Sequence, residues 1–354
     1  MNSNTTSLSL AVIALALAAT FIGCKGGDNY DSYSEYARSV FVSGTDVYVA
    51  GAALHGAVGA PDSDAKTSSN AVLWKNGVIQ YLTEYSDTRY SYSEAASVFL
   101  SGDDVYVAGT ELSADTLWSN AATLWKNGSP QRLAADGDSS SADSVFVSGG
   151  DVYVAGTINT MVNGQRLYLP VLWKNGAAQL LNVGSNSGIA RSVFVSGNNV
   201  YVAGSEWNGQ NAFAVLWKNG SPQYLTNGSS QAIAGSVFVS GDDVYAAGSE
   251  EDGTLPKAVV WKNGSPQYLT NGSSQATADS AFVSGGDVYV AGLEGVGTLP
   301  KAVVWKNGSP LYLTNGRGNA RSVFVFGGDV YVAGTTDGYA ATLWKNGAAQ
   351  RLNR

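Results

Sequence analysis

The amino-acid sequence predicts an all-β protein, a seven-bladed β-propeller made of four-stranded antiparallel blades. The first observation is the half-motif Ser-Val-Phe-Val-Ser-Gly-Thr-Asp-Val-Tyr-Val-Ala-Gly at residues 39–51, whose copies begin at Ser97, Ser144, Ser192, Ser236, Ser280 and Ser322. The second is a half-motif of the form Ala-Val-Leu-Trp-Lys-Asn-Gly after each copy, with its tryptophans at Trp74, Trp125, Trp173, Trp217, Trp261, Trp305 and Trp344. These tryptophans are 51, 48, 44, 44, 44 and 39 residues apart. One propeller blade of about 40–45 residues has this period.

Each copy divides into four predicted strands, which in the first copy span residues 39–42, 47–50, 71–75 and 80–83. The first three strands are continuous apolar runs, which indicates burial on both faces. The fourth alternates, and in four copies a proline stands just before it (Pro130, Pro222, Pro266 and Pro310). Because proline donates no ladder hydrogen bond, we place the fourth strand at the outer edge and the first strand innermost.

The turns and the order of the strands predict how the ring is built. The Asn-Gly pair after each Trp-Lys suits a two-residue hairpin between the third and fourth strands. The chain enters the first copy at its innermost strand and leaves the last copy at its outer strand. We therefore expect the ring to close by packing of the first blade on the seventh, without an exchanged strand.

The first residues have the composition of a targeting segment. Residues 1–23 contain no charged side chain, and residues 8–22 are nearly all apolar. About 20 apolar residues are needed to span a bilayer, so this run suits a signal-peptide core better. It ends in Phe21-Ile22-Gly23-Cys24, which resembles the bacterial lipobox and implies cleavage before a lipidated Cys24. The alternative is an ordinary secretory signal with an unmodified cysteine.

These features divide the chain into a lipoprotein signal peptide (1–23), a lipidated tether (24–36) and a propeller (37–354). Composition excludes some kinds of site. A single cysteine rules out a cysteine-based zinc site, and a single histidine, His55, leaves only one imidazole for acid–base catalysis. A net charge of −8 argues against nucleic acid or anionic lipid as the main partner. We expect the protein to bind no cofactor or metal and to be a monomer.

The arrangement resembles WD-repeat propellers in its apolar first strand, its Gly/Asp turn and the tryptophan near the end of the third strand. Those proteins carry Trp-Asp where this chain carries Trp-Lys, and a histidine in each inter-blade loop where this chain has none. The resemblance spans residues 37–354 and implies architecture alone. The chain is also similar to bacterial secreted lipoproteins with near-identical propeller repeats, which implies the bacterial cell envelope, at the outer membrane or cell surface.

Loop lengths predict one uniform face and one variable face. The first–second and third–fourth strand turns are short and nearly identical in all copies, whereas the second–third loops run from 19 residues (52–70) to 6 (335–340). Specific binding is therefore expected on the variable face. Trp118 and Trp207 are the tryptophans outside the repeat and fall in its loops. Each is a candidate stacking platform for a ligand, or the centre of a local apolar cluster.

The residue before the repeated serine differs between copies, which marks it as a second candidate. The seven residues are Arg38, Ala96, Asp143, Arg191, Gly235, Asp279 and Arg321. On the innermost strand they are expected to surround the mouth of a central channel. Arg38, Asp143, Arg191, Asp279 and Arg321 would then bind a polar or anionic ligand, or pair with one another.

The remaining charged residues favour structural roles. Glu206, Glu250, Glu251, Asp252 and Glu294 are expected to be solvated charges on the variable rim, and no calcium-loop motif accompanies them. The Asp before each second strand is expected to shape its turn, and the seven Trp-Lys lysines to form a basic ring on the uniform face. His55, in the longest loop, has no nearby carboxylate and is expected to be a loop residue.

The sequence thus favours a lipid-anchored, extracytoplasmic recognition module that binds protein or glycan through its variable face. An enzyme acting on glycans at the channel mouth is the alternative from another class, since propellers also carry such chemistry. A bare surface scaffold is the third. Arg–Asp pairs at the channel mouth with exposed tryptophan on the rim would favour binding, and an excess of acidic and aromatic residues facing the channel would favour the enzyme.

Overall fold

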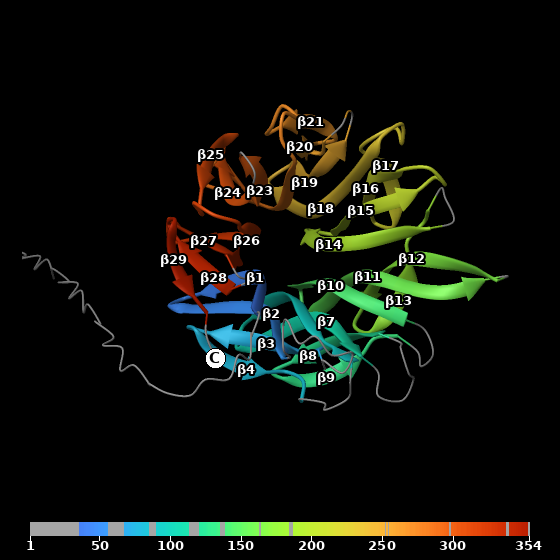
Figure 1. The fold of residues 1–354 in the computed structure, drawn as a ribbon. Coiled ribbons are helices and arrows are strands. Elements are labelled where there is room, and N and C mark those ends of the chain that lie inside the picture. The colour runs from blue at the N-terminus through green and yellow to red at the C-terminus, as the bar shows by residue number, and fades with distance from the viewer. Residues whose placement is uncertain are drawn as a thin grey trace, which may run out of the picture. The chain divides into compact units, whose positions relative to one another are not determined.

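The computed structural model describes residues 35–55, 67–84, 90–112, 120–134, 139–162, 164–183, 187–251, 253, 255–296, 299–337 and 340–352. Seven antiparallel sheets of sequential four-strand order are arranged around a central axis (Figure 1), which confirms the predicted seven-bladed β-propeller. Cys24, the signal peptide, most of the tether and Trp118 lie outside the described residues. Within these residues there is no apolar helix of a length that would cross a bilayer.

The blades follow one another along the chain. Blade 1 is β1 (Glu35–Ser43), β2 (Asp46–His55), β3 (Thr67–Lys75) and β4 (Val78–Tyr81), with β5 (Tyr90–Tyr92) parallel to β3. Blade 2 is β6 (Glu94–Ser101), β7 (Asp104–Leu112), β8 (Asn120–Lys126) and β9 (Ser129–Arg132), and blade 3 is β10 (Ser139–Ser148), β11 (Asp151–Val162), β12 (Gln165–Lys174) and β13 (Ala177–Leu180). Blade 4 is β14 (Gly188–Ser196), β15 (Asn199–Trp207), β16 (Ala212–Lys218) and β17 (Ser221–Tyr224).

Blade 5 is β18 (Gln231–Ser240), β19 (Asp243–Glu251), β20 (Lys257–Lys262) and β21 (Ser265–Tyr268). Blade 6 is β22 (Ala276–Ser284), β23 (Asp287–Val296), β24 (Leu299–Lys306) and β25 (Ser309–Tyr312). Blade 7 is β26 (Asn319–Phe326), β27 (Asp329–Thr336), β28 (Ala340–Lys345) and β29 (Ala348–Arg351). We call the four strands of a blade a to d, from the axis outward.

The inner strands are longer than their apolar runs. Strand β1 begins at Glu35, inside the predicted tether, and β11 continues to Val162, which pairs with Gln165 of β12. Backbone groups make the ladder whatever the side chain, so pairing continues where apolar burial ends. The prolines lie inside strand d, not before it, as in the pairing of Pro130 with Trp125. This is compatible with an edge strand, because the outer side of strand d needs no donor.

The repeated tryptophan and the glycine that ends the first half-motif form the core of each blade. All seven of these tryptophans are buried, with at most 1% of the side chain exposed. A Cβ added at Gly51 would lie 1.8 Å from the carbonyl oxygen of Tyr36 and 2.9 Å from the ring of Trp74. Only glycine therefore lets strand a and the indole approach strand b this closely.

Around the axis, the serine and phenylalanine of strand a connect each blade to the next. Seven phenylalanine rings form a closed circle with neighbouring centroids 4.6–5.0 Å apart, in the order Phe41, Phe99, Phe146, Phe194, Phe238, Phe282 and Phe324. The repeated serine accepts a hydrogen bond from the next blade, as in Val98 N to Ser39 Oγ at 3.3 Å. Two residues of the Ser-Val-Phe motif thus serve contacts between blades.

The ring closes between blades 1 and 7. Blade 7 takes its four strands from residues 319–351, as predicted. The backbone N–H of Val40 donates to Ser322 Oγ at 3.2 Å, which completes the circle of serine bonds. Leu352, fully buried, belongs to one apolar cluster with Val40 and Trp74 of blade 1 and Leu343 of blade 7. Side-chain packing therefore holds this interface.

The a–b and c–d turns lie together on the uniform face. The prediction that the seven Trp-Lys lysines form a basic ring there is wrong, because six of them pair with aspartates. Lys75 Nζ lies 2.7 Å from Asp46 Oδ2, and the equivalent ion pair is present in blades 2, 3, 5, 6 and 7. In blade 4, Asn199 replaces the aspartate. The c–d asparagine joins the aspartate in holding these turns, since Asn76 has a φ of 52°, its Oδ1 accepts from Val47 N at 2.8 Å and its Nδ2 donates to Asp46 Oδ1 at 2.8 Å.

Candidate functional site

A central cavity opens at the axial end of the variable face. It measures about 590 Å³, and its lining includes all seven residues that precede the repeated serine, which we call the ring residues: Arg38, Ala96, Asp143, Arg191, Gly235, Asp279 and Arg321. Each is the extra residue of a β-bulge, as where Ala37 pairs with Gly51 and Ser39 with Ala50. A bulge redirects a side chain, which explains why a variable residue stands inside an invariant motif.

Two ring arginines are paired with carboxylates. Arg321 Nη1 donates to Asp279 Oδ2 at 3.0 Å. Arg38 forms an ion pair with Glu94, a residue that sequence reasoning missed, and Tyr92 donates its hydroxyl to the same carboxylate. The central cavity therefore contains internal ion pairs together with charges that face its space.

Burial alters the acidity of two ring residues, Asp143 and Asp279. Burial raises the pKa of Asp143 to about 6, against the opposing effects of nearby Arg191 and of the hydroxyl of Ser141, which donates to Asp143 Oδ2 at 3.1 Å. Burial also raises the pKa of Asp279, although Arg321 opposes this. Among the residues described, no group of three or more His, Cys, Asp or Glu is placed to hold a metal ion.

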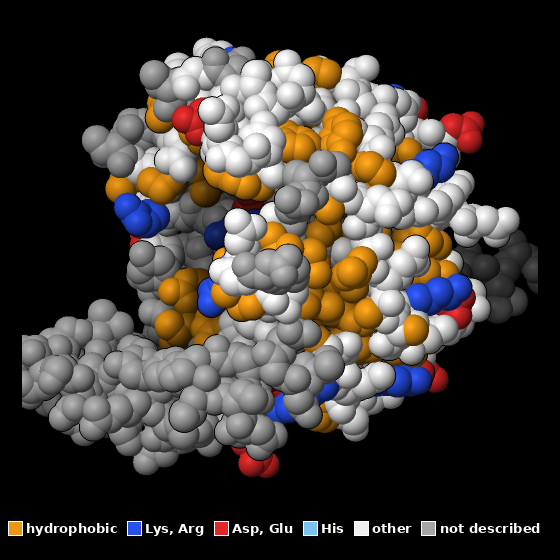
Figure 2. All heavy atoms as spheres, turned by 90° about the vertical axis from the view of Figure 1, so that its right-hand side faces the viewer, with side chains coloured by type: hydrophobic (Ala, Val, Ile, Leu, Met, Phe, Trp, Pro, Cys, Tyr) orange, Lys and Arg blue, Asp and Glu red, His pale blue; other side chains and the backbone are white. Residues whose placement is uncertain are grey.

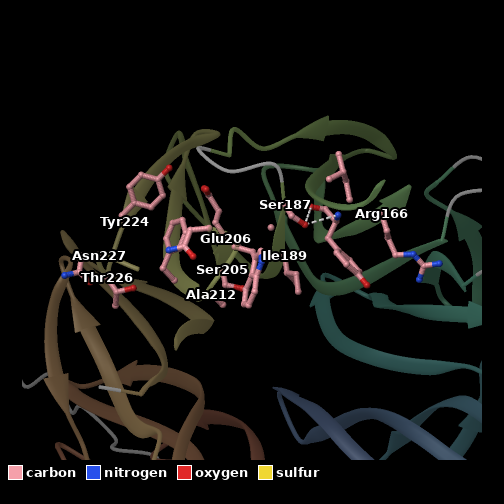
Figure 3. Close-up of a pocket in the computed structure, with 16 residues that line it drawn as sticks. Arg166, Ser187, Ile189, Ser205, Glu206, Ala212, Tyr224, Thr226 and Asn227 are labelled. Atoms are coloured by element: carbon pink, nitrogen blue, oxygen red, sulfur yellow. Dashed lines mark hydrogen bonds between the residues drawn. The ribbon is translucent and has the colours of Figure 1, made fainter. Parts of the chain in front are cut away.

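A larger outer cavity lies on the variable face where blade 3 meets blade 4. It measures about 1020 Å³ and is lined by residues that include Tyr168, Glu206, Trp207, Phe213, Tyr224 and Asn227. Figure 3 shows Tyr224 and Asn227 on one side, Arg166 on the other, and Glu206, Ser187 and Ile189 between them. Hydrophobic side chains gather on the side of the molecule that carries blades 3 and 4 (Figure 2). Tyr168, Trp207 and Tyr224 are among the exposed large hydrophobic residues there.

Trp207 belongs to this outer cavity and not to a loop. It is the last residue of β15, pairs in register with Ala212, and its N–H donates to Ser187 O at 3.0 Å. Its side chain is 43% exposed, so it is not the centre of a closed apolar cluster. The candidate residues thus divide between two cavities, with Trp207 in one and the ring residues in the other. His55 ends β2, and its side chain lies outside the description.

The acidic residues of the variable rim are not all solvated, and for Glu206 the expectation is wrong. Glu206 is 1% exposed at the outer cavity, whereas Glu250 and Glu294 are half-buried. Tyr268 donates to Glu250 Oε2 at 2.8 Å, and Tyr312 donates to Glu294 Oε2 at 2.9 Å. Asp252 lies outside the described residues.

Sequence reasoning missed Tyr168, Phe213 and Tyr224, which give the outer cavity its aromatic character. Tyr224 stands in strand d, where tyrosine recurs in several copies and therefore looked structural. A comparison of the copies position by position would have found Phe213, because blades 5 and 6 carry Lys257 and Lys301 at the same register position.

No protein-family model and no curated protein matches this sequence. The structure is similar to the acylaminoacyl peptidase of Pyrococcus horikoshii, with a TM-score of 0.54 and 13% identity over 90% of this chain and 52% of that one. An acylaminoacyl peptidase in complex with Z-Gly-Gly-Phe-chloromethyl ketone has a TM-score of 0.53 and 13% identity over 91% of this chain and 52% of that one. A third similar structure is the β-propeller domain of the trilobed protease from Pyrococcus furiosus, which is described as having an open velcro topology. Its TM-score is 0.51, with 11% identity over 91% of this chain and 98% of that one.

The likeness is one of fold. This chain spans about half the length of the two acylaminoacyl peptidases. At these identities the similarity supports the propeller architecture and carries no activity to this chain.

Proposed function

We propose that this chain is a lipid-anchored, extracytoplasmic recognition module that binds a protein or glycan at the outer cavity of the variable face. The observation that carries the proposal is the exposed Trp207 in a cavity of about 1020 Å³ that also presents Tyr168, Phe213 and Tyr224. Ligand sites are typically concave and apolar, with a few placed polar groups and a volume of about 300–1000 Å³. The outer cavity has these properties, with the carboxyl group of Glu206 as a buried polar group in its lining.

The uniform face has fewer of the properties of a binding surface. Its turns repeat the same Lys–Asp–Asn contacts in six blades, which leaves little basis for telling one ligand from another. The exposed aromatic side chains of blades 3 and 4 are instead of the kind that carries binding energy at interfaces.

Trp207→Ala tests the proposal once a ligand is found by screening the full-length chain against glycan and peptide arrays. Loss of a stacking aromatic is expected to weaken binding about 5- to 150-fold. Lys218→Ala, on the uniform face, is the control and is expected to change affinity less than about threefold. Isothermal titration of both variants decides. Loss of affinity in the Lys218 variant with full affinity in the Trp207 variant would place the site on the other face.

Cys24→Ser tests the anchor. We expect this change to leave the protein soluble in the periplasm or medium, because the lipid is then lost. Detergent phase separation of cell fractions measures it, and a variant that still partitions with the detergent phase would contradict lipidation at Cys24.

The second candidate, a glycan-acting enzyme at the central cavity, is favoured by one observation. A carboxyl group such as Asp143, whose pKa is raised to about 6, is of the kind that acts as a general acid near neutral pH. The pairing of Arg321 with Asp279 and of Arg38 with Glu94 favours binding instead. Hydrolysis of a chromogenic glycoside panel that Asp143→Asn abolishes would establish the enzyme.

A further inference from the structure

Four blades carry a glutamate two residues after the repeated glycine, and this permits a comparison within one chain. The residues are Glu111, Glu206, Glu250 and Glu294, in blades 2, 4, 5 and 6. In blades 5 and 6 the glutamate pairs across the b–c ladder with a lysine, Glu250 with Lys257 and Glu294 with Lys301. The same structural position therefore carries an acid and a base together in two blades.

A tyrosine of strand d completes the group in those two blades. Tyr268 donates to Glu250, and Lys257 Nζ lies 5.3 Å from the centre of the Tyr268 ring. In blade 6, Tyr312 donates to Glu294, and Lys301 Nζ lies 5.9 Å from the ring centre of Tyr312. An ammonium group over an aromatic face has a favourable cation–π interaction, and here the hydroxyl of the same tyrosine donates to the glutamate carboxylate.

Blade 4 keeps the glutamate and the tyrosine but replaces the lysine. Phe213 pairs with Glu206, and its ring centroid lies 5.4 Å from that of Tyr224. The two side chains occupy equivalent places, because a Cβ added at Gly228 would lie 3.3 Å from Phe213 Cδ1, and one added at the equivalent Gly272 would lie 2.6 Å from Lys257 Cε.

In blade 4, where the lysine is replaced, the glutamate is more buried and lies at a cavity. Blade 2 has Arg132 at the strand-d position, so among the four blades with this glutamate, blade 4 has neither Lys nor Arg at the strand-c and strand-d positions. Its glutamate is also the one that is 1% exposed and lines the outer cavity. Arg166, the basic residue of the lining, lies across the cavity from Tyr224 in Figure 3.

We propose that the outer cavity binds the side-chain ammonium of a lysine presented by a protein or peptide partner, in the role that Lys257 and Lys301 serve in blades 5 and 6. This inference rests on the proposed function and names its ligand. Glu206 supplies the carboxylate, and Trp207, Phe213 and Tyr224 supply the aromatic faces.

A peptide, and not a free amine, suits the size and surroundings of the cavity. The outer cavity shares Tyr224, Thr226 and Asn227 with a second cavity of about 930 Å³, whose lining includes Glu250 and Glu251. Together they give room for main chain beside the lysine. The net charge of −8 also favours approach of a basic partner.

Two probes that differ in one charge test the proposal on the full-length chain: acetyl-Gly-Lys-Gly-amide and the same peptide with norleucine. Titration calorimetry at low salt is expected to show about tenfold or greater preference for the lysine peptide, which falls as salt is raised. n-Butylammonium, which lacks the peptide main chain, is expected to bind more weakly than the lysine peptide.

Two variants locate the preference. Glu206→Gln keeps the shape and is expected to reduce the preference for lysine to about twofold or less, without weakening the norleucine peptide. Phe213→Lys supplies the base from the chain itself, as in blades 5 and 6, and is expected to weaken the lysine peptide by about tenfold or more. Phe213→Met is its control, matched in length and without charge. Thermal melting verifies that each variant is folded.

The outcomes separate this inference from the proposed function. Equal binding of both peptides, weakened in Trp207→Ala, would overturn the ammonium site and leave the cavity as a binding site. A glycan ligand that depends on Trp207 and not on Glu206 would overturn it in favour of glycan. Ligand binding that none of these variants affects would overturn both proposals.

Discussion

The residue before the repeated serine is the extra residue of a β-bulge in every blade, and its side chain is therefore free of the ladder's packing constraints. The flanking serine and phenylalanine are the same in all copies, because they connect neighbouring blades. The bulge residue takes no part in these shared contacts and varies between Arg, Asp, Ala and Gly, so that only some copies add an ion pair to the next blade, as Arg321 does with Asp279. Charge at the central cavity is thus set one residue at a time, without a change in the scaffold.

Asp143→Asn tests the consequence of one such charge. The pKa of Asp143 in the folded protein, about 6, lies above its ordinary value of about 3.9. Between these values the folded state binds the proton more tightly than the unfolded state, so the free energy of unfolding falls as pH rises from 4 to 6. At pH 8 the amide is expected to raise that free energy by about 1–2 kcal/mol, and at pH 4 to change it little.

Urea denaturation at both pH values measures this difference. The exposed turn variant Asp242→Asn is the control for loss of a carboxylate as such. An equal effect of Asp143→Asn at pH 4 and pH 8 would contradict the raised pKa.

At the scale of the strands, two glycines of each first half-motif serve different needs. In blade 3, Gly149 has a φ of 60° in the a–b turn, with no atom within 4 Å of an added Cβ. Gly156 lies within β11, where an added Cβ would be 1.9 Å from Ser141 O and 2.9 Å from the ring of Trp173. Glycine is needed at the first position because the backbone has a positive φ, and at the second position because neighbouring atoms leave no room for a Cβ.

Alanine at each position is expected to separate the two effects. Gly156→Ala forces strand a or Trp173 to move, and we expect a loss of about 3 kcal/mol or more in the free energy of unfolding. Gly149→Ala meets no neighbour and is expected to cost about 1 kcal/mol through its positive φ. Chemical denaturation of both variants measures this. Equal losses would show that the packing at Gly156 yields to a methyl group.

The sequence predicts an element well when the contacts that form it lie within one repeat or between neighbouring repeats. The spacing from Trp74 to Trp125 and the Asn76-Gly77 turn predict the blades, because each copy folds by contacts within itself and with its neighbours. The ring residues could be placed at the axis, since the innermost strand presents the same position seven times. These predictions needed only the repeat.

The outer cavity depended on contacts that the repeat does not encode. Glu206 pairs in register with Phe213 and lines the outer cavity together with residues of blade 3, and the pattern common to all copies predicts neither placement. The same holds for Trp207, whose place at the end of β15 follows from ladder bonds that any residue makes. Differences between copies carry this information, and their common pattern does not.

At the scale of the whole molecule, the propeller is a circle of seven interfaces, of which six are also connected through the chain. The interface between blades 1 and 7 has the same serine bond and the same phenylalanine contact as the others, with 4.8 Å between the ring centroids of Phe41 and Phe324. It lacks a chain connection, because blade 1 begins and blade 7 ends the ring. This interface depends on non-covalent contacts, and Leu352 lies buried within it.

Leu352→Ala is therefore expected to loosen the ring at this interface. Its matched control is Leu181→Ala, at the equivalent place between blades 3 and 4, where Leu181 is also buried. Each change removes a core leucine and is expected to cost about 2–5 kcal/mol in the free energy of unfolding. The two differ in reach: blades 3 and 4 stay joined by residues 181–188, whereas blades 1 and 7 can separate. Hydrogen exchange is expected to show lost protection along β1–β4 and β26–β29 in the Leu352 variant, and only near the substituted residue in the Leu181 variant. Equally local loss in both variants would mean that packing alone holds blades 1 and 7 as firmly as a chain connection holds the others.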